Sequence, residues 1–489
     1  MDNKKEQLAD IVGSRFVSDD PAVLDTYARD NSFVLPLKPW FVAQPGSVDE
    51  VQKLVAWANH SSTPLIPVSS GPPHFHGDTV PSAPGAVIVE LSRMNRVLRI
   101  DRRNRMTWIE PGVTYGRLQP ELVKEGLRLT TPLMPRPNKS VIASLLERQP
   151  TLIARYHYSF TEPLRSCGVV WGTGEMMYTG EAGSGPLSLE AQWSMGARHS
   201  DPKGPGATDY VRLLTGAQGS MGIVTWASVR CELIPAMRKL FFVPATTPES
   251  LIDFMHRLLR VRLGDEVILV NNTQLAYMLA HQADKVAALT KSLPPWLLII
   301  GIGGRALFPE ERVDEQQQDL VELAQTYGVR LASGIHGATT NEVYDLLLAP
   351  SREPYWKLSY KGACEQIFFL STLDKSREFI DTVYHTARIH NYPESEIGVY
   401  IQPQHQGVAH HCEFNLPYDP RDFNEVSNIK QLFSKASEAL VSGGAYFSRP
   451  YGIWADMMYS RDAQSTSALR KVKRIFDPNN VMNPGKLCF

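Results

Sequence analysis

Apolar and polar positions follow one another along the chain in patterns that predict both strands and helices. Between residues 41 and 68, an apolar run is followed by a polar turn, a helical repeat and a second apolar run. In the helical repeat, one face carries the apolar residues Val48, Val51, Leu54 and Val55. Ser47, followed three residues later by Glu50, has the spacing of an N-terminal capping box. The stretch predicts a strand–helix–strand unit, and a helical segment is expected before it over residues 1–35.

Short strands are expected to dominate up to about residue 130. Residues 86–94 and 97–112 contain short apolar runs with no helical repeat between them, and a helix is expected near residues 116–126. In a doubly wound parallel sheet, helices alternate with strands, whereas here the strands follow one another directly. A mixed α+β fold therefore fits the pattern better.

After about residue 240 the helical repeats become longer. Helices are expected over residues 248–263, 310–328, 339–349 and 376–392. Strands are expected at residues 296–304 and 365–372. This pattern predicts an antiparallel sheet covered by helices, and hence a second domain. In the C-terminal segment, a basic helix is stopped by "DPNN" and "NPG".

The composition restricts the kind of partner. The chain has 489 residues with 50 Lys and Arg against 51 Asp and Glu, and it has no basic run, so a small-molecule ligand is expected and no nucleic acid. No window reaches the ~18 apolar residues of a membrane span, and the N-terminus has no apolar signal segment. We therefore expect a soluble, cytoplasmic protein. The five cysteines show no C-x-x-C spacing, so buried free thiols are expected.

The stretch "SSGPPHFHGDT", residues 69–79, is a glycine-containing turn directly after an apolar run. Such a turn can bind a phosphate by directing successive backbone N–H groups at the anion. Pro72 and Pro73 have no N–H, so a phosphate cradle would have to use the amides of Ser70, Gly71 and residues 74–77. The local residues leave three alternatives open: a plain turn, an anion cradle, and a metal site with His74 and His76 as ligands.

A cluster of histidines lies in "QPQHQGVAHHCEF", residues 402–414. In a continuous strand, His411 and Glu413 point to one face together with His405, and His410 points to the other. Imidazole and carboxylate groups on one face could hold a divalent metal such as zinc, iron or manganese, with His405, His411 and Glu413 as its ligands. Alternatively, His405 or His411 lines a substrate pocket as an acid or base, or the histidines are ordinary polar strand residues.

Several segments, taken in order, resemble the vanillyl-alcohol oxidase and p-cresol methylhydroxylase superfamily of flavoproteins, which includes glycolate-oxidase-type and D-2-hydroxy-acid dehydrogenases. The segments are "FVAQPGSVDEVQKLV", "PLIPVSSG", "AVIVELSRMNRVLRID", "IEPGVTYGRL", "GAQGSMGIVTWASVRCELIP" and "DPNNVMNPGKL". The resemblance implies a two-part FAD-binding domain of the p-cresol methylhydroxylase type, formed by residues 1–238 and by the segment 441–489, with a cap domain over residues 239–440.

The resemblance also implies where FAD binds. The implied contacts are Ser69, Ser70, Gly71, His74, Phe75, Gly77, Gly219, Ser220, Gly222, Ile223 and Asn483. A second loop that carries glycines in the family has none here between Gly126 and Gly168. Relatives often attach the flavin through His or Tyr, but "KGACEQIFFLST" has neither. We therefore expect noncovalent FAD.

The resemblance implies substrate contacts as well. His76 stands where phenol-oxidising relatives have a substrate-binding tyrosine, while Tyr446 matches another family tyrosine and Arg449 could pair with a carboxylate. Tyr156, His157 and Tyr158 are expected near the cofactor or in a surface loop anchored by aromatic packing.

We expect an FAD-dependent dehydrogenase of a small 2-hydroxy acid or related alcohol. His405 or His411 would be the base, and a protein or quinone would accept the electrons. The alternatives are a dehydrogenase of a 4-alkylphenol or hydroxybenzyl alcohol, held by Tyr446 and His76, and a flavin-poor subunit of a larger redox complex. The oligomeric state, homo- or hetero-oligomer, stays open.

Overall fold

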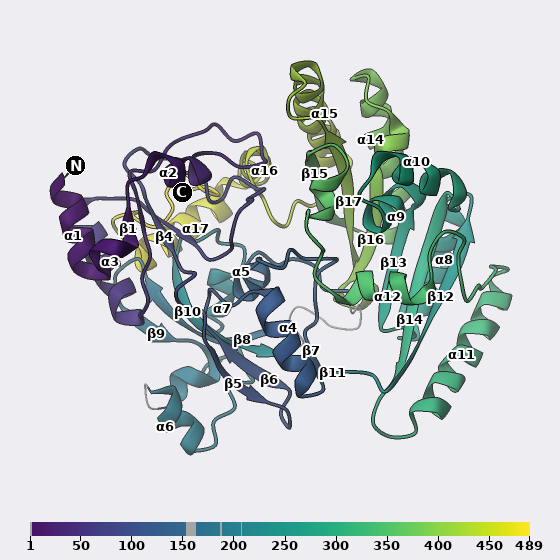
Figure 1. Cartoon of the computed structure of the whole chain (residues 1–489), viewed down its shortest axis with the longest axis horizontal. Coiled ribbons are helices and arrows are strands. Elements are labelled where there is room, and N and C mark those ends of the chain that lie inside the picture. Colours follow the sequence, from purple (N-terminus) through teal and green to yellow (C-terminus); the bar gives the residue numbers. More distant parts are fainter. Residues whose placement is uncertain (1, 153–162, 186–187, 207) are drawn as a thin grey trace.

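The computed structural model describes residues 2–152, 163–185, 188–206 and 208–489. Figure 1 shows an N-terminal region on one side, joined by the C-terminal helices, and a second region built around its own sheet on the other. The N-terminal segment was expected to be helical throughout, but it forms two helices, α1 (Asp2–Val12) and α2 (Pro21–Ala28). Residues 29–40 are irregular because Pro36 and Pro39 interrupt any helix there.

The first sheet contains the predicted strand–helix–strand unit. Its strand order is β1 (Val17–Ser18), β2 (Phe41–Ala43), β4 (Val87–Glu90) and β3 (Leu65–Val68), with β2, β4 and β3 parallel. Helix α3 (Val48–Ser61) connects β2 to β3, and the Ser47 side chain accepts a hydrogen bond from the Glu50 N–H at 3.2 Å. The apolar face of α3 packs on the sheet, and β3 delivers the chain to the loop over residues 69–79.

The second sheet is antiparallel. Its order is β5 (Val97–Asp101), β6 (Met106–Ile109), β10 (Gly222–Arg230), β8 (Leu164–Trp171) and β9 (Met176–Tyr178). The associated helices are α4 (Tyr115–Lys124), α5 (Val141–Leu146), α6 (Leu189–Ser194) and α7 (Val211–Leu214). A short pair of strands, β7 (Leu127–Arg128) and β11 (Glu232–Leu233), lies where the chain leaves this region.

The C-terminal segment returns to the N-terminal region. It contains α16 (Ile453–Tyr459) and α17 (Ala463–Phe476), and the predicted stop signal ends α17 at Asp477. The backbone N–H of Asn483 donates to the carbonyl of Leu65 at 2.8 Å, so the segment adds to the edge of β3. The Lys486 ammonium donates to the carbonyls of Gly77 and Val80 at 2.7 and 2.8 Å. These bonds fix the loop after β3.

The cap sheet is antiparallel and six-stranded. Its order is β12 (Met237–Ala245), β14 (Trp296–Gly304), β13 (Glu266–Asn271), β16 (Gly398–Gln404), β17 (Ala409–Tyr418) and β15 (Ala363–Ser371). Its helices are α8 (Glu249–Arg260), α9 (Asn272–Leu279), α10 (Ala283–Ser292), α11 (Pro309–Thr326), α12 (Thr340–Leu348), α13 (Trp356–Ser359), α14 (Ser376–Ile389) and α15 (Phe423–Ser442). We propose domain limits at residues 238 and 440, because the cap sheet begins and its last helix ends near them.

Strand alternation divides the cap sheet into two faces. Val267 and Leu269 pack with α8, α11, α14 and α15 on one face, and Ile268 and Val270 pack with α9, α10 and α12 on the other. On this second face, β15, β16 and β17 carry mainly polar side chains together with Phe368, and this part of the face looks toward the N-terminal region. The polar half of this face therefore forms one wall of the site described below.

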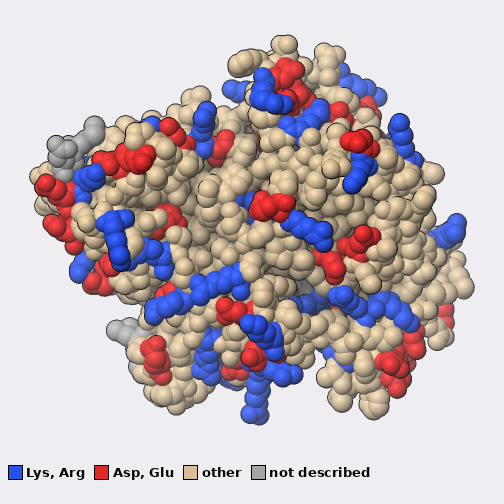
Figure 2. Space-filling model, in the orientation of Figure 1, with Lys and Arg blue, Asp and Glu red and all other residues tan. Residues whose placement is uncertain are grey.

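Charges of both signs are interspersed over the face of the molecule shown in Figure 2. This arrangement agrees with the near balance of 50 basic and 51 acidic residues in the chain. Among the described residues, no helix combines the length and the apolar character needed to cross a bilayer.

Candidate active site

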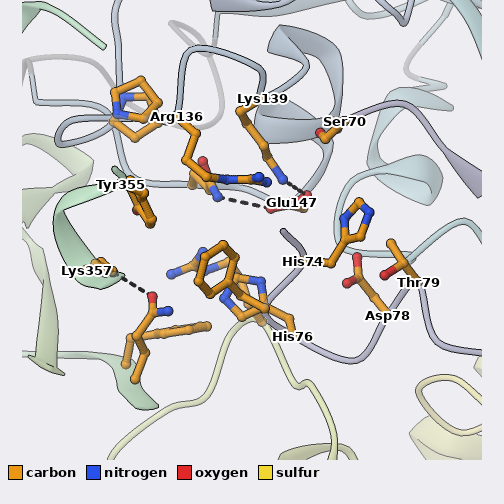
Figure 3. A pocket seen from close by; sticks show the side chains of 18 of the residues that line it. Ser70, His74, His76, Asp78, Thr79, Arg136, Lys139, Glu147, Tyr355 and Lys357 are labelled. Atoms are coloured by element: carbon orange, nitrogen blue, oxygen red, sulfur yellow. Dashed lines mark hydrogen bonds and ion pairs between the residues drawn. The ribbon is translucent and has the colours of Figure 1, made fainter. Parts of the chain in front are cut away.

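Two clefts meet beneath the loop that follows β3. The interdomain cleft, of about 990 Å³, lies between N-terminal loops and the polar face of the cap sheet (Figure 3). The N-terminal cleft, of about 760 Å³, lies between the same loops and the start of β10. Both clefts are lined by Pro67, Ser69, Asp78, Ala143 and Glu147. These shared residues mark a junction through which one long ligand can occupy both clefts.

The loop over residues 69–79 forms one side of the interdomain cleft. Of the cofactor contacts expected here, four line the cleft: Ser69, Ser70, His74 and Phe75. Gly71 and Gly77 do not line it. The N–H of Gly71 donates to the carbonyl of Asn138 at 3.1 Å, and the N–H of Gly77 donates to Asp30 Oδ2 at 2.5 Å. Because both amides are satisfied within the protein, the anion cradle considered from the sequence lacks two of its donors.

Two glycines shape the N-terminal cleft, which Ile223 also lines. Gly219 has φ +70, and a Cβ there would lie 2.6 Å from Cγ of Pro67. A Cβ at Gly222 would lie 2.5 Å from the carbonyl oxygen of Val170. Such contacts are too short for any side chain, so these positions require glycine.

Two other expected cofactor contacts line neither cleft. The Ser220 hydroxyl donates to the carbonyl of Ala217 at 2.6 Å. The Asn483 amide donates to the carbonyls of Asp78 and Gln218 at 2.9 and 2.7 Å. Both side chains therefore hold the loops that form the cleft walls.

The glycine-free second loop, residues 132–150, packs directly on the first. The Asn138 amide donates to the carbonyl of Pro72 at 2.7 Å, and Arg136 donates to the carbonyl of Gly71 at 2.9 Å. Lys139 forms an ion pair with Glu147 at the junction of the clefts. This loop therefore presents charged side chains to the interdomain cleft.

Four side chains form a buried network on the cap wall. Lys357, on α13, pairs with Glu413, and its ammonium also donates to Gln366 Oε1 at 2.5 Å. The Tyr400 hydroxyl donates to Glu413 Oε2 at 2.7 Å. His411 Nε2 lies 3.0 Å from the same carboxylate oxygen and 3.2 Å from the Tyr400 hydroxyl. Adjacent strands create the cluster, because Tyr400 on β16 is the cross-strand neighbour of Glu413 on β17.

The charges within this network stabilise one another. Burial alone would raise the pKa of Glu413, but Lys357 and His411 outweigh it and lower that pKa. Burial alone would lower the pKa of Lys357, but the Glu413 carboxylate raises it. Burial lowers the pKa of His411, against the opposing effect of Glu413. At neutral pH the network therefore contains an ammonium, a carboxylate and a neutral imidazole.

Arg449 and His76 also line the interdomain cleft. The Arg449 guanidinium lies over the ring of Phe368 at 3.9 Å, and the residue is only 6% exposed. It forms no ion pair with any carboxylate in the described part of the chain. The His76 ring stacks on Tyr451 with centroids 4.6 Å apart, and burial together with Arg449 lowers the pKa of His76 well below its usual value. The cleft therefore combines a fixed cation with neutral aromatic walls.

The predicted metal set is not assembled. Residues 402–414 form a hairpin and not one strand: β16 ends at Gln404, and His405 has φ 50 in the turn before β17. His411 and Glu413 do share a face, but Lys357 already neutralises that carboxylate. In the ranges that the structure describes, no three His, Cys, Asp or Glu side chains are grouped to hold a metal ion.

Other expected site residues lie elsewhere. Tyr446 is 58% exposed and lines a separate hollow beside α16 and α17, because its backbone pairs with the edge strand residue Leu370. Tyr156, His157 and Tyr158 fall outside the described residues. Lys357, Tyr355 and Tyr400 line the cleft but were not predicted from the sequence, although strand alternation around "GVYIQPQ" could have placed Tyr400 and Gln402 on one face.

Two family descriptions match the chain. Residues 39–178 match "FAD binding domain", and residues 372–487 match "FAD linked oxidases, C-terminal domain". An uncharacterised FAD-linked oxidoreductase of Mycobacterium tuberculosis is 22% identical over 99% of both chains. A D-2-hydroxyglutarate dehydrogenase of Xanthomonas citri pv. viticola is 22% identical over 96% of this chain and 93% of its own.

The fold is also that of a solved structure. Substrate-bound p-cresol methylhydroxylase superposes with a TM-score of 0.82 at 17% identity, over 100% of this chain and 96% of the other. The chain therefore contains the two domains of FAD-linked oxidoreductases, and it shares the fold of p-cresol methylhydroxylase. The expected α+β fold, with a two-part FAD domain and an antiparallel cap, is confirmed.

The residues present fit FAD. Two clefts meet at a junction, and at Gly219 and Gly222 the wall of the N-terminal cleft packs too closely for any side chain. His74 and His76 each have a buried Nε2 atom without a hydrogen-bond partner among the described residues. Side chains that can hold the cofactor therefore come from both loops and from β10, whereas no described cluster supports the metal.

We expect Gly219→Ala to weaken FAD binding about tenfold or more, because a Cβ would collide with Pro67 and force the loop to move. FAD affinity would be measured by quenching of flavin fluorescence. Gly196→Ala is the matched control, because Gly196 has φ +86 but nothing within 4 Å of its Cβ position. Equal FAD affinity in the two variants would contradict the collision argument.

Proposed function

We propose that the protein is an FAD-dependent dehydrogenase that oxidises a small 2-hydroxy acid or a related alcohol. Arg449 carries the proposal, because a buried guanidinium without a carboxylate partner favours an anionic ligand in the same cleft. A guanidinium can bind a carboxylate with two parallel hydrogen bonds, which would also orient the neighbouring carbinol carbon. The D-2-hydroxyglutarate dehydrogenase among the relatives supports the same substrate class.

The cap network supplies an acceptor for the hydroxyl proton. Tyr400 and Glu413 line the cleft, and His411 lies directly behind them in contact with both. A proton taken at the Tyr400 oxygen can pass to Glu413 or to the neutral His411 ring, because Tyr400 already donates to that carboxylate. His411 is therefore proposed as the proton acceptor through Tyr400, while His405 lies in the hairpin turn away from the cleft.

FAD, when bound, accepts the hydride that leaves the carbinol carbon. We propose that it is held without a covalent bond. On β15, Gln366 and Phe368 line the cleft and neither can form a flavin linkage, while the pKa of the nearby Cys364 thiol is raised by burial to about 12. Precipitation with acid is expected to release all of the yellow chromophore into solution, and flavin retained on the denatured chain would overturn this part of the proposal.

A second candidate substrate is a 4-alkylphenol or hydroxybenzyl alcohol. Tyr355 and Tyr400 line the interdomain cleft, and Tyr451 lies against His76, so a phenolate beside Arg449 would have aromatic neighbours. The likeness to p-cresol methylhydroxylase supports this alternative. The two residues expected from the sequence to hold the phenol, His76 and Tyr446, do not support this alternative as a pair, because Tyr446 lies outside the cleft.

A substrate panel under anaerobic conditions separates the two candidates. The holoenzyme is mixed with short and long 2-hydroxy acids, with dicarboxylic 2-hydroxy acids and with 4-alkylphenols, and bleaching of the flavin absorbance is followed. Reduction by a 2-hydroxy acid is expected. Reduction by phenols alone would replace the first proposal with the second. The FAD-domain match favours both over the flavin-poor subunit.

We propose a protein or a quinone as the electron acceptor, which makes the enzyme a dehydrogenase and not an oxidase. After reduction by substrate, reoxidation is expected to be at least about tenfold faster with a soluble quinone than with dissolved oxygen. Two stopped-flow traces, one with the quinone under anaerobic conditions and one with oxygen alone, measure the two reoxidation rates. Equally fast reoxidation by oxygen would identify an oxidase.

A further inference from the structure

Asp78 occupies an unusual place for a carboxylate in a protein that binds FAD. It is one of five residues that line both clefts, and Glu147 is the other acid among them. Figure 3 shows Asp78 beside His74 and Thr79. The FAD diphosphate connects the nucleotide half of the molecule to the flavin half. If FAD spans the two clefts, the diphosphate belongs at this junction.

The cations near Asp78 are already engaged. Lys139 pairs with Glu147, and Lys486 donates to the carbonyls of Gly77 and Val80. The other titratable groups near Asp78 are Asp30, which follows α2, Tyr451 on the C-terminal segment, and His74 beside it, whose pKa burial lowers to about 3 so that it stays neutral. An ionised Asp78 would therefore meet the negative charges of a diphosphate without a cation of its own between them.

The surroundings make a neutral Asp78 accessible at ordinary pH. Burial raises the pKa of Asp78 to about 7, with Glu147 and Asp30 adding to the effect and Lys139 and Lys486 opposing it. A protonated carboxylic acid has an O–H group that can donate to a phosphate oxygen. An ionised carboxylate has only acceptors, and so it can only repel the phosphate.

We propose that Asp78 binds the FAD diphosphate as a neutral carboxylic acid that donates a hydrogen bond to a phosphate oxygen, so that FAD binding takes up one proton. The Asp78 side chain would then give the loop over residues 69–79 a hydrogen-bond donor. It would replace the backbone N–H groups of Gly71 and Gly77, which already donate within the protein. The sign of the pH effect follows directly. FAD affinity is constant while Asp78 is protonated in the free protein, and it falls as pH rises above the pKa of that group.

The test is the dissociation constant of FAD for the full-length protein between pH 6 and 8.5, measured by flavin fluorescence after removal of the cofactor. The wild-type constant is expected to rise about thirtyfold over this range, as a single group with a pKa near 7 requires. Asp78→Asn keeps an N–H donor without a titrating group, and its constant is expected to change less than about threefold. Circular dichroism at both ends of the pH range checks that each protein remains folded.

A second measurement does not depend on any variant. Titration calorimetry of the wild-type apoprotein with FAD at pH 7.5, in two buffers with different heats of ionisation, is expected to show the uptake of most of one proton. A wild-type affinity that does not change with pH, an equal slope in Asp78→Asn, or the absence of proton uptake would each overturn the proposal. None of these readouts uses a substrate, so the outcome is independent of the proposed 2-hydroxy acid activity.

Discussion

Replacing Arg449 with alanine is expected to lower kcat/KM for an anionic substrate about a hundredfold to a thousandfold, since losing one partner of a buried charge pair costs about 3 to 4 kcal/mol. The residue is buried, rests on Phe368 and has no carboxylate partner among the described residues, so its charge is available to the ligand. Arg449→Lys keeps the charge but loses the two-pronged geometry, and only partial recovery is expected. Steady-state kinetics with the best acid from the panel measures both variants.

The neutral analogue of that substrate gives the decisive comparison. An alcohol in which a methyl group replaces the carboxylate should be oxidised slowly by the wild type and about equally slowly by Arg449→Ala, because neither can form the ion pair. Arg474→Ala is the surface control, because Arg474 lies exposed on α17, and no change is expected. An equal loss for the acid and for the neutral alcohol would show that Arg449 supports the cleft wall and does not anchor a carboxylate.

Replacing Glu413 with alanine is expected to destabilise the protein by about 3 to 5 kcal/mol, because it leaves the Lys357 ammonium buried without its partner. Tyr400 and His411 also lose their shared acceptor. Activity should fall with the loss of the proton path. Denaturant unfolding followed by fluorescence, compared at matched FAD saturation, measures the stability change.

The matched control removes both charges together. Lys357→Met combined with Glu413→Gln leaves no unpaired charge, and the glutamine can still accept from Tyr400, so most of the lost stability should return, to within about 1.5 kcal/mol of wild type. Activity should stay low, because without the Glu413 carboxylate the imidazolium that forms when His411 takes up a proton is no longer stabilised. A double variant with normal activity would exclude the network from proton transfer. A double variant as unstable as Glu413→Ala would show that the unpaired Lys357 charge does not cause the loss of stability.

Several features could be predicted from the sequence because they depend on local rules. The strand–helix–strand unit at residues 41–68 follows from periodicity and from the Ser47 cap. The antiparallel sheet and long helices of the cap could also be predicted from periodicity. His411 and Glu413 share a face, as predicted, because the side chains of a strand alternate between its two faces. The ordered family segments indicated FAD, which the matches to two FAD-enzyme domains confirm.

Other features depended on turns and on contacts between distant segments. His405 does not lie with the other predicted metal ligands, because it falls in a hairpin turn between two strands. Periodicity alone cannot distinguish one long strand from two strands joined by a turn. Tyr446 and Arg449 are only three residues apart, yet one is exposed beside the tail helices and the other is buried in the cleft. The places of Tyr446 and Arg449 depend on how the C-terminal segment packs against the rest of the protein, and no local sequence pattern predicts that packing.

The sequence by itself determined the classes of element, the order of the two regions and the identity of the cofactor-binding family. Only the tertiary structure decided which charges meet. Lys357 reaches Glu413 across 56 positions, and Asp78 meets Glu147, Lys139 and Lys486 from loops that are far apart in the chain. Electrostatic effects depend on distance and burial and not on sequence separation, so the chemistry of this site could be understood only after the chain was folded.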